Sequence, residues 1–250
     1  MIRLNFLVII FSCFLAHPLK AQFSQGTDFW VGFMEHVDPD KNTKVLMITS
    51  GSRTSGTVEV PMKGWKKDFT VSPDEVAFVK LPMSVETIGS EWRQETGVRV
   101  RSRQPVSVYA HQYANSRSEA ALVLPVASLD DEYYVMSYKG YEEQGVAYPS
   151  EFLIVAVAHD TELEIIPKDF TKKGRPPGSL NRITLNRGET FQVQGQSPRA
   201  DLTGSYIKAN KPFALFAGNV WTQVPGECIA PDNLYEQMYP ISSWGTETIA

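Results

Sequence analysis

The sequence predicts an all-β protein built from two tandem, sandwich-like β units that are related by internal duplication and contain little helix. Residues 96–110 return as residues 203–217 at a constant offset of 107 positions, and each copy shows a strand, a polar break before a proline and a second strand. Short apolar segments bounded by Gly, Pro, Ser or Asp recur along the whole chain. No segment shows a sustained helical period with caps.

In the first half, runs rich in β-branched and aromatic residues predict strands at residues 29–34, 44–49, 56–61 and 75–81. Val98 and Val100 then alternate with Arg99, Arg101 and Arg103. Because successive side chains of a strand point to opposite faces, this alternation predicts a further strand whose valines face the core and whose arginines face solvent.

The second half follows the same order, with predicted strands at residues 152–158, 162–167, 183–185 and 190–193. The first of these is almost continuously apolar, which is typical of a central strand. Residues 186–189 form a predicted tight turn, in which Gly188 is expected to have a positive φ. One turn of helix is expected near residues 232–238.

The predicted domain organisation has three segments: a signal peptide at residues 1–21, a first β unit at residues 22–140 and a second β unit at residues 141–250. The apolar run of the signal peptide is too short to cross a bilayer, and no later stretch is long and apolar enough to do so. We therefore expect an exported protein without a transmembrane span, located in the extracellular space or at the cell surface. Residues 125–129 recur as residues 240–244, so the matching strand is expected to be truncated at Ala250 and further domains of the same polypeptide are expected to follow.

The net charge and the cysteine content restrict the class of binding partner and the possible disulfide bonds. The net charge of −4 disfavours nucleic acid, whose recognition needs a basic face. Cys228 is the one cysteine that remains after removal of the signal peptide, so no intramolecular disulfide is expected. We interpret Cys228 as a small buried apolar residue, with pairing to another chain left open.

Local motifs of catalysis and of cofactor binding are absent from the sequence, including the nucleophile elbow, the zinc-protease His pair and the phosphate-binding Gly-Lys loop. No catalytic residue, cofactor or metal ligand is therefore assigned. His36, His111 and His159 lie far apart in the chain and are interpreted as surface or strand-end residues. Residues 38–42 resemble the opening of a calcium loop but lack its glycine and its final acid, which favours a turn.

An alternative function is a carbohydrate-active enzyme or its accessory domain, because surface carboxylates accompany many aromatic residues. The candidate acids are Glu35, Glu119, Asp130, Asp131, Glu132, Glu142 and Glu143. The run from Asp130 to Glu132 is more simply interpreted as a solvated guard of a strand edge.

Five of the ten tyrosines fall between Tyr133 and Tyr148. Tyrosine offers a large amphipathic contact area at low entropic cost, which suits protein or sugar recognition. Tyr138, Tyr141 and Tyr148 are therefore the candidate binding residues, and packing of a strand and an interdomain linker is the alternative explanation.

Four segments resemble the N-terminal domain family of IgGFc-binding protein. They are residues 26–30 (GTDFW), 105–110 (PVSVYA), 212–218 (PFALFAG) and 235–240 (YEQMYP). The resemblance implies a secreted, non-enzymatic adhesion or binding module that recognises an extracellular protein or glycan and uses no cofactor. Pro231 stands where the family often has a cysteine, so a local disulfide with Cys228 is not expected.

Overall fold

The computed structural model describes residues 24–114, 117–226 and 228–245. The predicted signal peptide and the predicted truncated strand at the end of the chain lie outside these residues. The described part is all-β, as predicted, and its helical content is confined to 3-10 turns of three residues. These turns are η1 (Pro39–Lys41), η2 (Pro61–Lys63), η3 (Met83–Val85), η4 (Val126–Ser128) and η5 (Ile241–Ser243).

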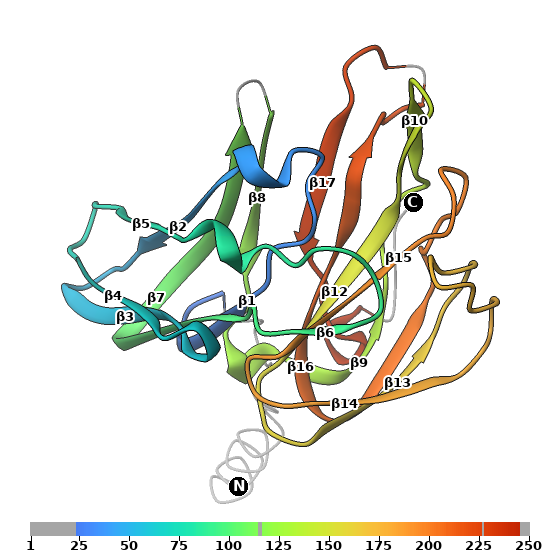
Figure 1. Cartoon of the computed structure of the whole chain (residues 1–250). Coiled ribbons are helices and arrows are strands. Elements are labelled where there is room, and N and C mark those ends of the chain that lie inside the picture. Colours follow the sequence, from blue (N-terminus) through green and yellow to red (C-terminus); the bar gives the residue numbers. More distant parts are fainter. Residues whose placement is uncertain (1–23, 115–116, 227, 246–250) are drawn as a thin grey trace, which may run out of the picture.

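The first unit consists of two four-stranded layers that share one long, bent strand (Figure 1). Its strands are β1 (Gly26–Val31), β2 (Thr43–Thr49), β3 (Thr54–Val60), β4 (Trp65–Val71), β5 (Ala77–Lys80), β7 (Val98–Ala114) and β8 (Arg117–Val123). The first half of β7 pairs with β1 and β3, and the second half pairs with β2 and β8. The layer orders are therefore β4-β3-β7-β1 and β5-β2-β7-β8.

The second unit repeats this plan around β16. Its strands are β9 (Asp130–Tyr134), β12 (Ser150–Ala156), β13 (Thr161–Ile166), β14 (Asn181–Leu185), β15 (Thr190–Gln194), β16 (Tyr206–Thr222) and β17 (Asp232–Gln237). The first half of β16 pairs with β9 and β13, and the second half pairs with β12 and β17. The layers are β14-β13-β16-β9 and β15-β12-β16-β17, and a hairpin of β10 (Tyr141–Glu143) and β11 (Val146–Tyr148) precedes β12.

The internal duplication is visible strand by strand. The shared strands β7 and β16 each contain 17 residues, and Pro105 and Pro212 are equivalent by the repeat offset of 107. A proline donates no backbone hydrogen bond, so it suits the point where each strand passes from one layer to the other. The outward arginines of β7 are confirmed as well, since Val98 and Val100 are fully buried while Arg101 and Arg103 are exposed.

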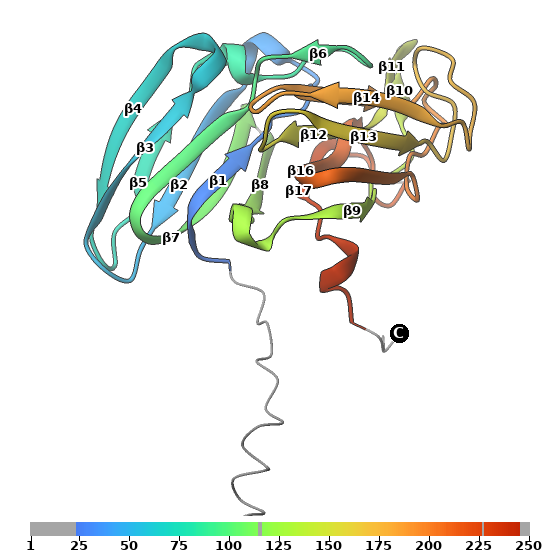
Figure 2. The same ribbon diagram turned by 90° about the horizontal axis from the view of Figure 1, so that it is seen from below.

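Two short segments of the first half join the second sheet. β9 lies before residue 140 but pairs with β16, and β6 (Arg93–Gln94) crosses to pair with β15 (Figure 2). Each unit therefore begins with the strand that borders the first half of its long strand, β1 in one and β9 in the other. The division of the chain at residue 140 stays a prediction.

The helical turn predicted near residues 232–238 is wrong, because the segment forms strand β17. Its burial alternates with a period of two: Asn233, Tyr235 and Gln237 are buried, whereas Leu234 and Glu236 are less so. Pairing with the edge of β16 outweighs the local helical signal.

The two units pack against each other through an apolar junction. The core of the first unit includes side chains of the second, namely Leu153, Val155, Ala214, Phe216 and Tyr235. A second core lies inside the second unit and includes Phe152, Ile154, Phe213 and Leu215. Every residue of β12 is buried, because one of its faces lines each core, which confirms the predicted central strand.

Close approach at the junction depends on Gly32. A Cβ atom on Gly32 would lie 2.6 Å from Val155 and 2.7 Å from Leu153, so a larger residue would have to displace these buried side chains. Nearby, the ring of Tyr235 stacks between those of Phe33 and Phe216, with centroid distances of 5.8 and 5.5 Å.

Within the part of the chain that the structure describes, no helix meets the length and hydropathy that crossing a membrane requires.

Candidate functional site

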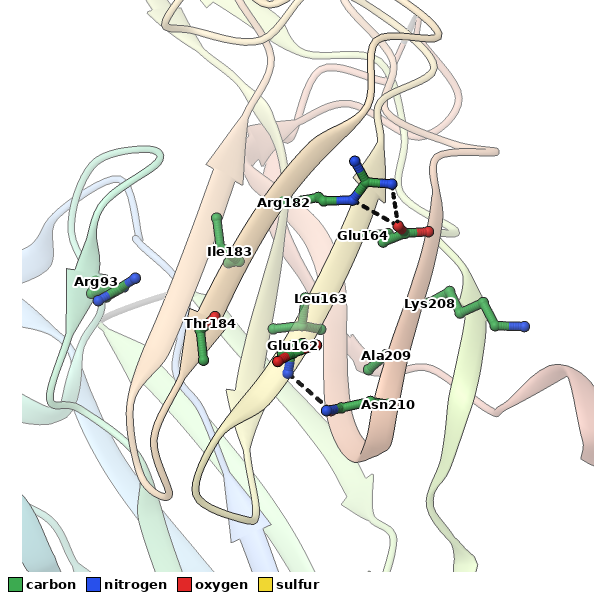
Figure 3. Close-up of a pocket in the computed structure, with 10 residues that line it drawn as sticks. All are labelled: Arg93, Glu162, Leu163, Glu164, Arg182, Ile183, Thr184, Lys208, Ala209 and Asn210. Atoms are coloured by element: carbon green, nitrogen blue, oxygen red, sulfur yellow. Dashed lines mark hydrogen bonds and ion pairs between the residues drawn. The ribbon is translucent and has the colours of Figure 1, made fainter.

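The outer face of the β14-β13-β16-β9 layer carries a row of alternating charges. Arg182, Glu164, Lys208 and Glu132 stand opposite one another on the four strands. Arg182 forms an ion pair with Glu164 at 2.8 Å, and Lys208 forms one with Glu132 at 2.8 Å. In Figure 3 the Arg182 guanidinium reaches toward Glu164, while the Lys208 side chain points away from that pair. All four groups are accessible to solvent, so these pairs order the surface more than they stabilise the fold.

This row borders a shallow hollow of about 480 Å³ (Figure 3). Its lining comes from β13, β14 and β16, with Arg93 of β6 at one side. The lining includes carboxylate, ammonium, amide and guanidinium groups, whereas the side chains of Leu163 and Ile183 pack in or against the core of the second unit. Oriented polar groups around a depression are typical of ligand-binding sites.

Aromatic rings form the next row of the same face. Tyr206 stands opposite Tyr134, with ring centroids 5.3 Å apart, and Trp244 lies 6.0 Å from Tyr134. Tyr134 is 40% exposed and Trp244 is 47% exposed. Exposed, ordered rings of this kind provide contact area for a protein or a sugar. We call Tyr134, Tyr206 and Trp244 the aromatic row.

Hydrogen bonding holds the aromatic row in place. The Tyr206 hydroxyl donates to Oε1 of Glu132, and Lys208 Nζ donates to the same oxygen at 2.8 Å. The bond to the Glu132 carboxylate raises the pKa of Tyr206 to about 12. The pKa of Glu132 is lowered by these two hydrogen bonds, and the one from Lys208 has the larger effect. The Tyr206 ring is therefore a neutral, oriented hydrogen-bonding group at neutral pH.

Sequence reasoning included Tyr134 in the tyrosine cluster but missed Tyr206 and Trp244. Tyr206 and Lys208 alternate with the buried Ile207, which is a signal of an outward-facing pair. The aromatic row itself depends on the register between β9 and β16, which are separated by more than 70 residues. Local sequence does not specify that register.

The first unit has a hollow in the equivalent position. It measures about 500 Å³ and is lined by residues of β3, β4 and β7. Residues 55–57 and 101–103 of this hollow become residues 162–164 and 208–210 of the other when the repeat offset of 107 is added. The duplication has therefore reproduced the surface relief as well as the fold.

The predicted tyrosines lie together on one side of the second unit. Tyr141 and Tyr148 are directly paired across the β10–β11 hairpin, and Tyr138 precedes it. All three are half-buried. Gln223 Nε2 donates to the Tyr141 hydroxyl at 3.3 Å, and Lys139 Nζ lies 5.9 Å from the centre of the Tyr138 ring. Tyr141 also lines a hollow of about 430 Å³.

A buried polar network lies where the two units meet. Lys44 and Glu86 form an ion pair whose side chains are almost fully removed from solvent. Gln194 Nε2 donates to Glu35 at 3.0 Å and to Glu151 at 2.9 Å, which links two carboxylates from different units. Burial raises the pKa of Glu86 to about 7 and raises the pKa of Glu151 well above its usual range. This network joins the two units, and all of its named members except the partly buried Glu35 are buried.

The interpretation of His36 as a surface or strand-end residue is wrong. His36 is 1% exposed and its Nε2 lies 3.1 Å from Oδ1 of Asn233 across the junction. Burial lowers the pKa of His36 to about 4, so the ring is neutral at physiological pH. His111 is half-buried on β7, where it stacks on Tyr113.

The interpretation of Cys228 as a buried core residue is also wrong, since Cys228 is half-buried in the loop before β17. Residues 38–42 contain the 3-10 turn η1, and across this turn Asn42 Nδ2 donates to the Asp38 carbonyl at 2.6 Å. Among the described residues, no group of three or more His, Cys, Asp or Glu side chains is arranged to hold a metal ion.

The predicted acids are dispersed in the fold. Glu35 joins the buried network, Glu132 supports the aromatic row, and Glu142 and Glu143 lie on the exposed hairpin. Glu119 faces two other carboxylates, Asp232 and Glu236. Burial and these neighbours raise the pKa of Glu119 to about 7.

Comparisons with known proteins agree with the resemblance seen in the sequence. The profile of the family described as IgGFc binding protein matches residues 119–250. Human IgGFc-binding protein is 30% identical over 209 residues, which cover 82% of this chain. The chain spans only 4% of the length of that relative. No solved structure matches the chain. The family match covers more than half of the sequence and the relative aligns with most of it, so this chain belongs to the IgGFc-binding protein family.

Proposed function

We propose that the protein is an extracellular or cell-surface binding module, without catalytic activity, that recognises a protein or a glycan through the outer face of its second unit. The observation that carries the proposal is the aromatic row beside the charged hollow. Two exposed rings and one half-buried ring lie within 6.0 Å of their neighbours, with Tyr134 and Tyr206 on adjacent strands and Trp244 beside them at the end of η5. A surface that is already ordered loses little conformational entropy when it binds.

The chemistry of this face suits an amphipathic partner. The rings offer flat apolar surface, while Lys208 on β16, Glu164 on β13 and Arg182 on β14 offer charged hydrogen-bonding groups on successive strands of the same layer. The human relative is named for binding the Fc region of immunoglobulin G. The Fc region is therefore the first protein ligand to test, and mucin glycans serve as the test for the glycan side of the proposal.

The test measures binding of the purified protein to immobilised immunoglobulin Fc and, separately, to mucin glycans by biolayer interferometry. Tyr134→Ala and Trp244→Ala should each weaken binding about tenfold or more, because exposed aromatic residues are common hot spots. Trp92→Ala is the matched control, since Trp92 is 50% exposed but lies on the loop before β6. A folded protein that binds neither ligand would count against the proposal, as would equal losses in all three variants.

Tyr138, Tyr141 and Tyr148 form a second proposed binding surface, supported by the hollow that Tyr141 lines and by the hairpin that carries two of the rings. The variant Tyr141→Phe removes the hydroxyl that accepts from Gln223 but keeps the ring, whereas Tyr141→Ala removes both. If the ring contacts the ligand, only the alanine variant should weaken binding. Unchanged binding by both would restrict the site to the aromatic row.

The alternative of a carbohydrate-active enzyme needs two carboxylates that face each other across a cleft. The hollow in Figure 3 contains Glu162 and Glu164, but Glu164 is engaged by Arg182. This pairing favours a binding role. Release of reducing sugar from mucin glycans by the purified protein, and its loss in Glu162→Gln, would favour the enzyme instead.

Export is proposed from the sequence of residues 1–21 and from the membership of the family. When the gene is expressed with its own N-terminal segment, the mature protein should appear outside the cytoplasm and begin at Gln22. N-terminal sequencing of the product measures this. A product that stays in the cytoplasm with Met1 or Ile2 at its start would contradict the assignment.

A further inference from the structure

The outer face of the β5-β2-β7-β8 layer presents a continuous row of apolar side chains. Phe78, Met47, Tyr109 and Leu122 stand opposite one another on the four strands. Phe78 is 64% exposed and Tyr109 is 39% exposed, while Met47 and Leu122 are partly exposed. We call these four residues the apolar row. A contiguous apolar surface on a sheet marks an interaction site.

The duplication shows what covers this face in the other unit. Tyr109 and Phe216 are equivalent by the repeat offset of 107, and their partners on the neighbouring strand are Met47 and Leu153. The β15-β12-β16-β17 layer of the second unit is therefore equivalent to the β5-β2-β7-β8 layer of the first. There the face is buried, because Leu153 and Phe216 belong to the core of the first unit. In this fold the face is therefore used as a docking surface for another unit of the same kind.

The surface that docks on it is also duplicated. The first unit contributes the outward residues Trp30 and Gly32, both covered by the second unit: Trp30 is 1% exposed, and Gly32 approaches Val155. Val100 and Ile207 are equivalent by the repeat offset of 107. Phe29 pairs with Val100 and Tyr133 pairs with Ile207, so Tyr133 is equivalent to Phe29. Tyr134 and Met136 are therefore equivalent to Trp30 and Gly32. Tyr134 is 40% exposed and Met136 is 65% exposed.

We propose that two copies of this chain associate head to tail, with the apolar row of one copy docked on Tyr134 and Met136 of the next. Each half of this contact reproduces a contact that the chain already makes between its own two units. The interface is heterologous, so association continues into rings or open chains instead of stopping at a symmetric pair.

The turns at the edges of the docked layers agree with this arrangement. Within the chain, the turn between β14 and β15 covers Trp30, and a Cβ atom on Gly188 would lie 3.2 Å from that ring. The equivalent turn between β4 and β5 carries Val76, which is 44% exposed. In the proposed contact Val76 takes the place of the Gly188 turn and covers Tyr134 of the neighbouring copy.

The copied contact differs from the original most in the size of its facing side chains. Met136 stands where the first unit has Gly32, and the facing residue is Met47 instead of Leu153. A methionine side chain holds the layers further apart than glycine does but adapts readily to an irregular surface. We therefore expect a reversible contact that is weaker than the junction inside the chain.

Sedimentation velocity of the purified protein over a range of concentrations tests the proposal. The unmodified protein should form species larger than a monomer as its concentration rises. Phe78→Glu and Met136→Lys should each abolish association, because each places a charge in the contact. Ile229→Glu is the control, since Ile229 is 97% exposed in the loop before β17 and should leave association unchanged.

A mixture of the Phe78→Glu variant with a Met136→Glu variant gives the sharpest outcome, because two glutamates repel each other where the altered faces would meet, whereas a lysine at position 136 would attract the new glutamate at position 78. Each variant retains the face that the other lacks, so the mixture should form dimers and nothing larger. A monomer at every concentration, or association that Met136→Lys leaves intact, would overturn the proposal. Circular dichroism checks that each variant is folded. No ligand is added in these measurements, because Tyr134 also belongs to the aromatic row and a ligand bound there would compete with association.

Discussion

The buried ion pair between Lys44 and Glu86 is a residue-scale feature with a large expected effect on stability. Both side chains are almost inaccessible to solvent, at 0% and 3% exposure. Lys44→Met should destabilise the protein by about 3–5 kcal/mol, because it leaves the Glu86 carboxyl buried without its partner. Urea unfolding measures this loss. The double variant Lys44→Met with Glu86→Leu should recover much of it, and a double variant as unstable as the single one would contradict the explanation.

The carboxyl of Glu119 gives stability a dependence on pH. Burial, Asp232 and Glu236 raise the pKa of Glu119 to about 7 in the folded protein, whereas an unperturbed glutamate has a pKa of 4.5. Between these pH values the folded state retains a proton that the unfolded chain releases, so the stabilising contribution is lost as pH rises through 7. His36, whose pKa is lowered to about 4, acts in the opposite sense between pH 4 and 6.5.

Glu119→Gln isolates the first of these effects, because the amide does not titrate. In urea unfolding between pH 5 and 8, the variant should lose less stability with rising pH than the unmodified protein does. Glu142→Gln is the control, since Glu142 is exposed on the β10–β11 hairpin. A pH profile that is the same in the Glu119→Gln and Glu142→Gln variants would contradict the assignment.

At the scale of the elements, the turn at Gly188 joins backbone conformation to packing. Gly188 has φ of 85°, and a Cβ atom there would lie 3.2 Å from the Trp30 ring. Gly174 has nearly the same φ of 82°, with open space around it. Gly174→Ala should cost about 1–2 kcal/mol from backbone strain alone. Gly188→Ala should cost more and should alter tryptophan fluorescence, and equal losses would exclude a packing role for the turn.

The positive φ at Gly188, the outward arginines of β7 and the central position of β12 follow from patterns of a few neighbouring residues, which explains why they are predictable from sequence. The strand at residues 232–237 was not predicted, because its pairing with β16 is a tertiary contact that the local pattern of these few residues does not show. The same limit applies to the aromatic row, since Tyr134 and Tyr206 meet only through the register of β9 on β16. Pairing between distant strands is set by burial of whole faces, which local patterns do not record.

At the scale of the whole molecule, the shared junction implies that the two units unfold together. Leu153, Val155 and Phe216 of the second unit belong to the core of the first, so separation of the units would expose part of both. Calorimetry should therefore show a single transition whose calorimetric and van't Hoff enthalpies agree. Two resolved transitions in the unmodified protein would show that the units are stable separately.

Gly32→Val tests whether the junction is the cause of this cooperativity. The valine side chain would enter space occupied by Leu153 and Val155, so the variant should lose about 1–3 kcal/mol and its transition should broaden or split. Gly51→Val is the matched control, because no atom lies within 4 Å of a Cβ at Gly51. If both variants unfold in one sharp transition at the same temperature, contacts other than those at Gly32 couple the units. Substitutions in the buried network around Glu151 and Gln194 would then be tested next.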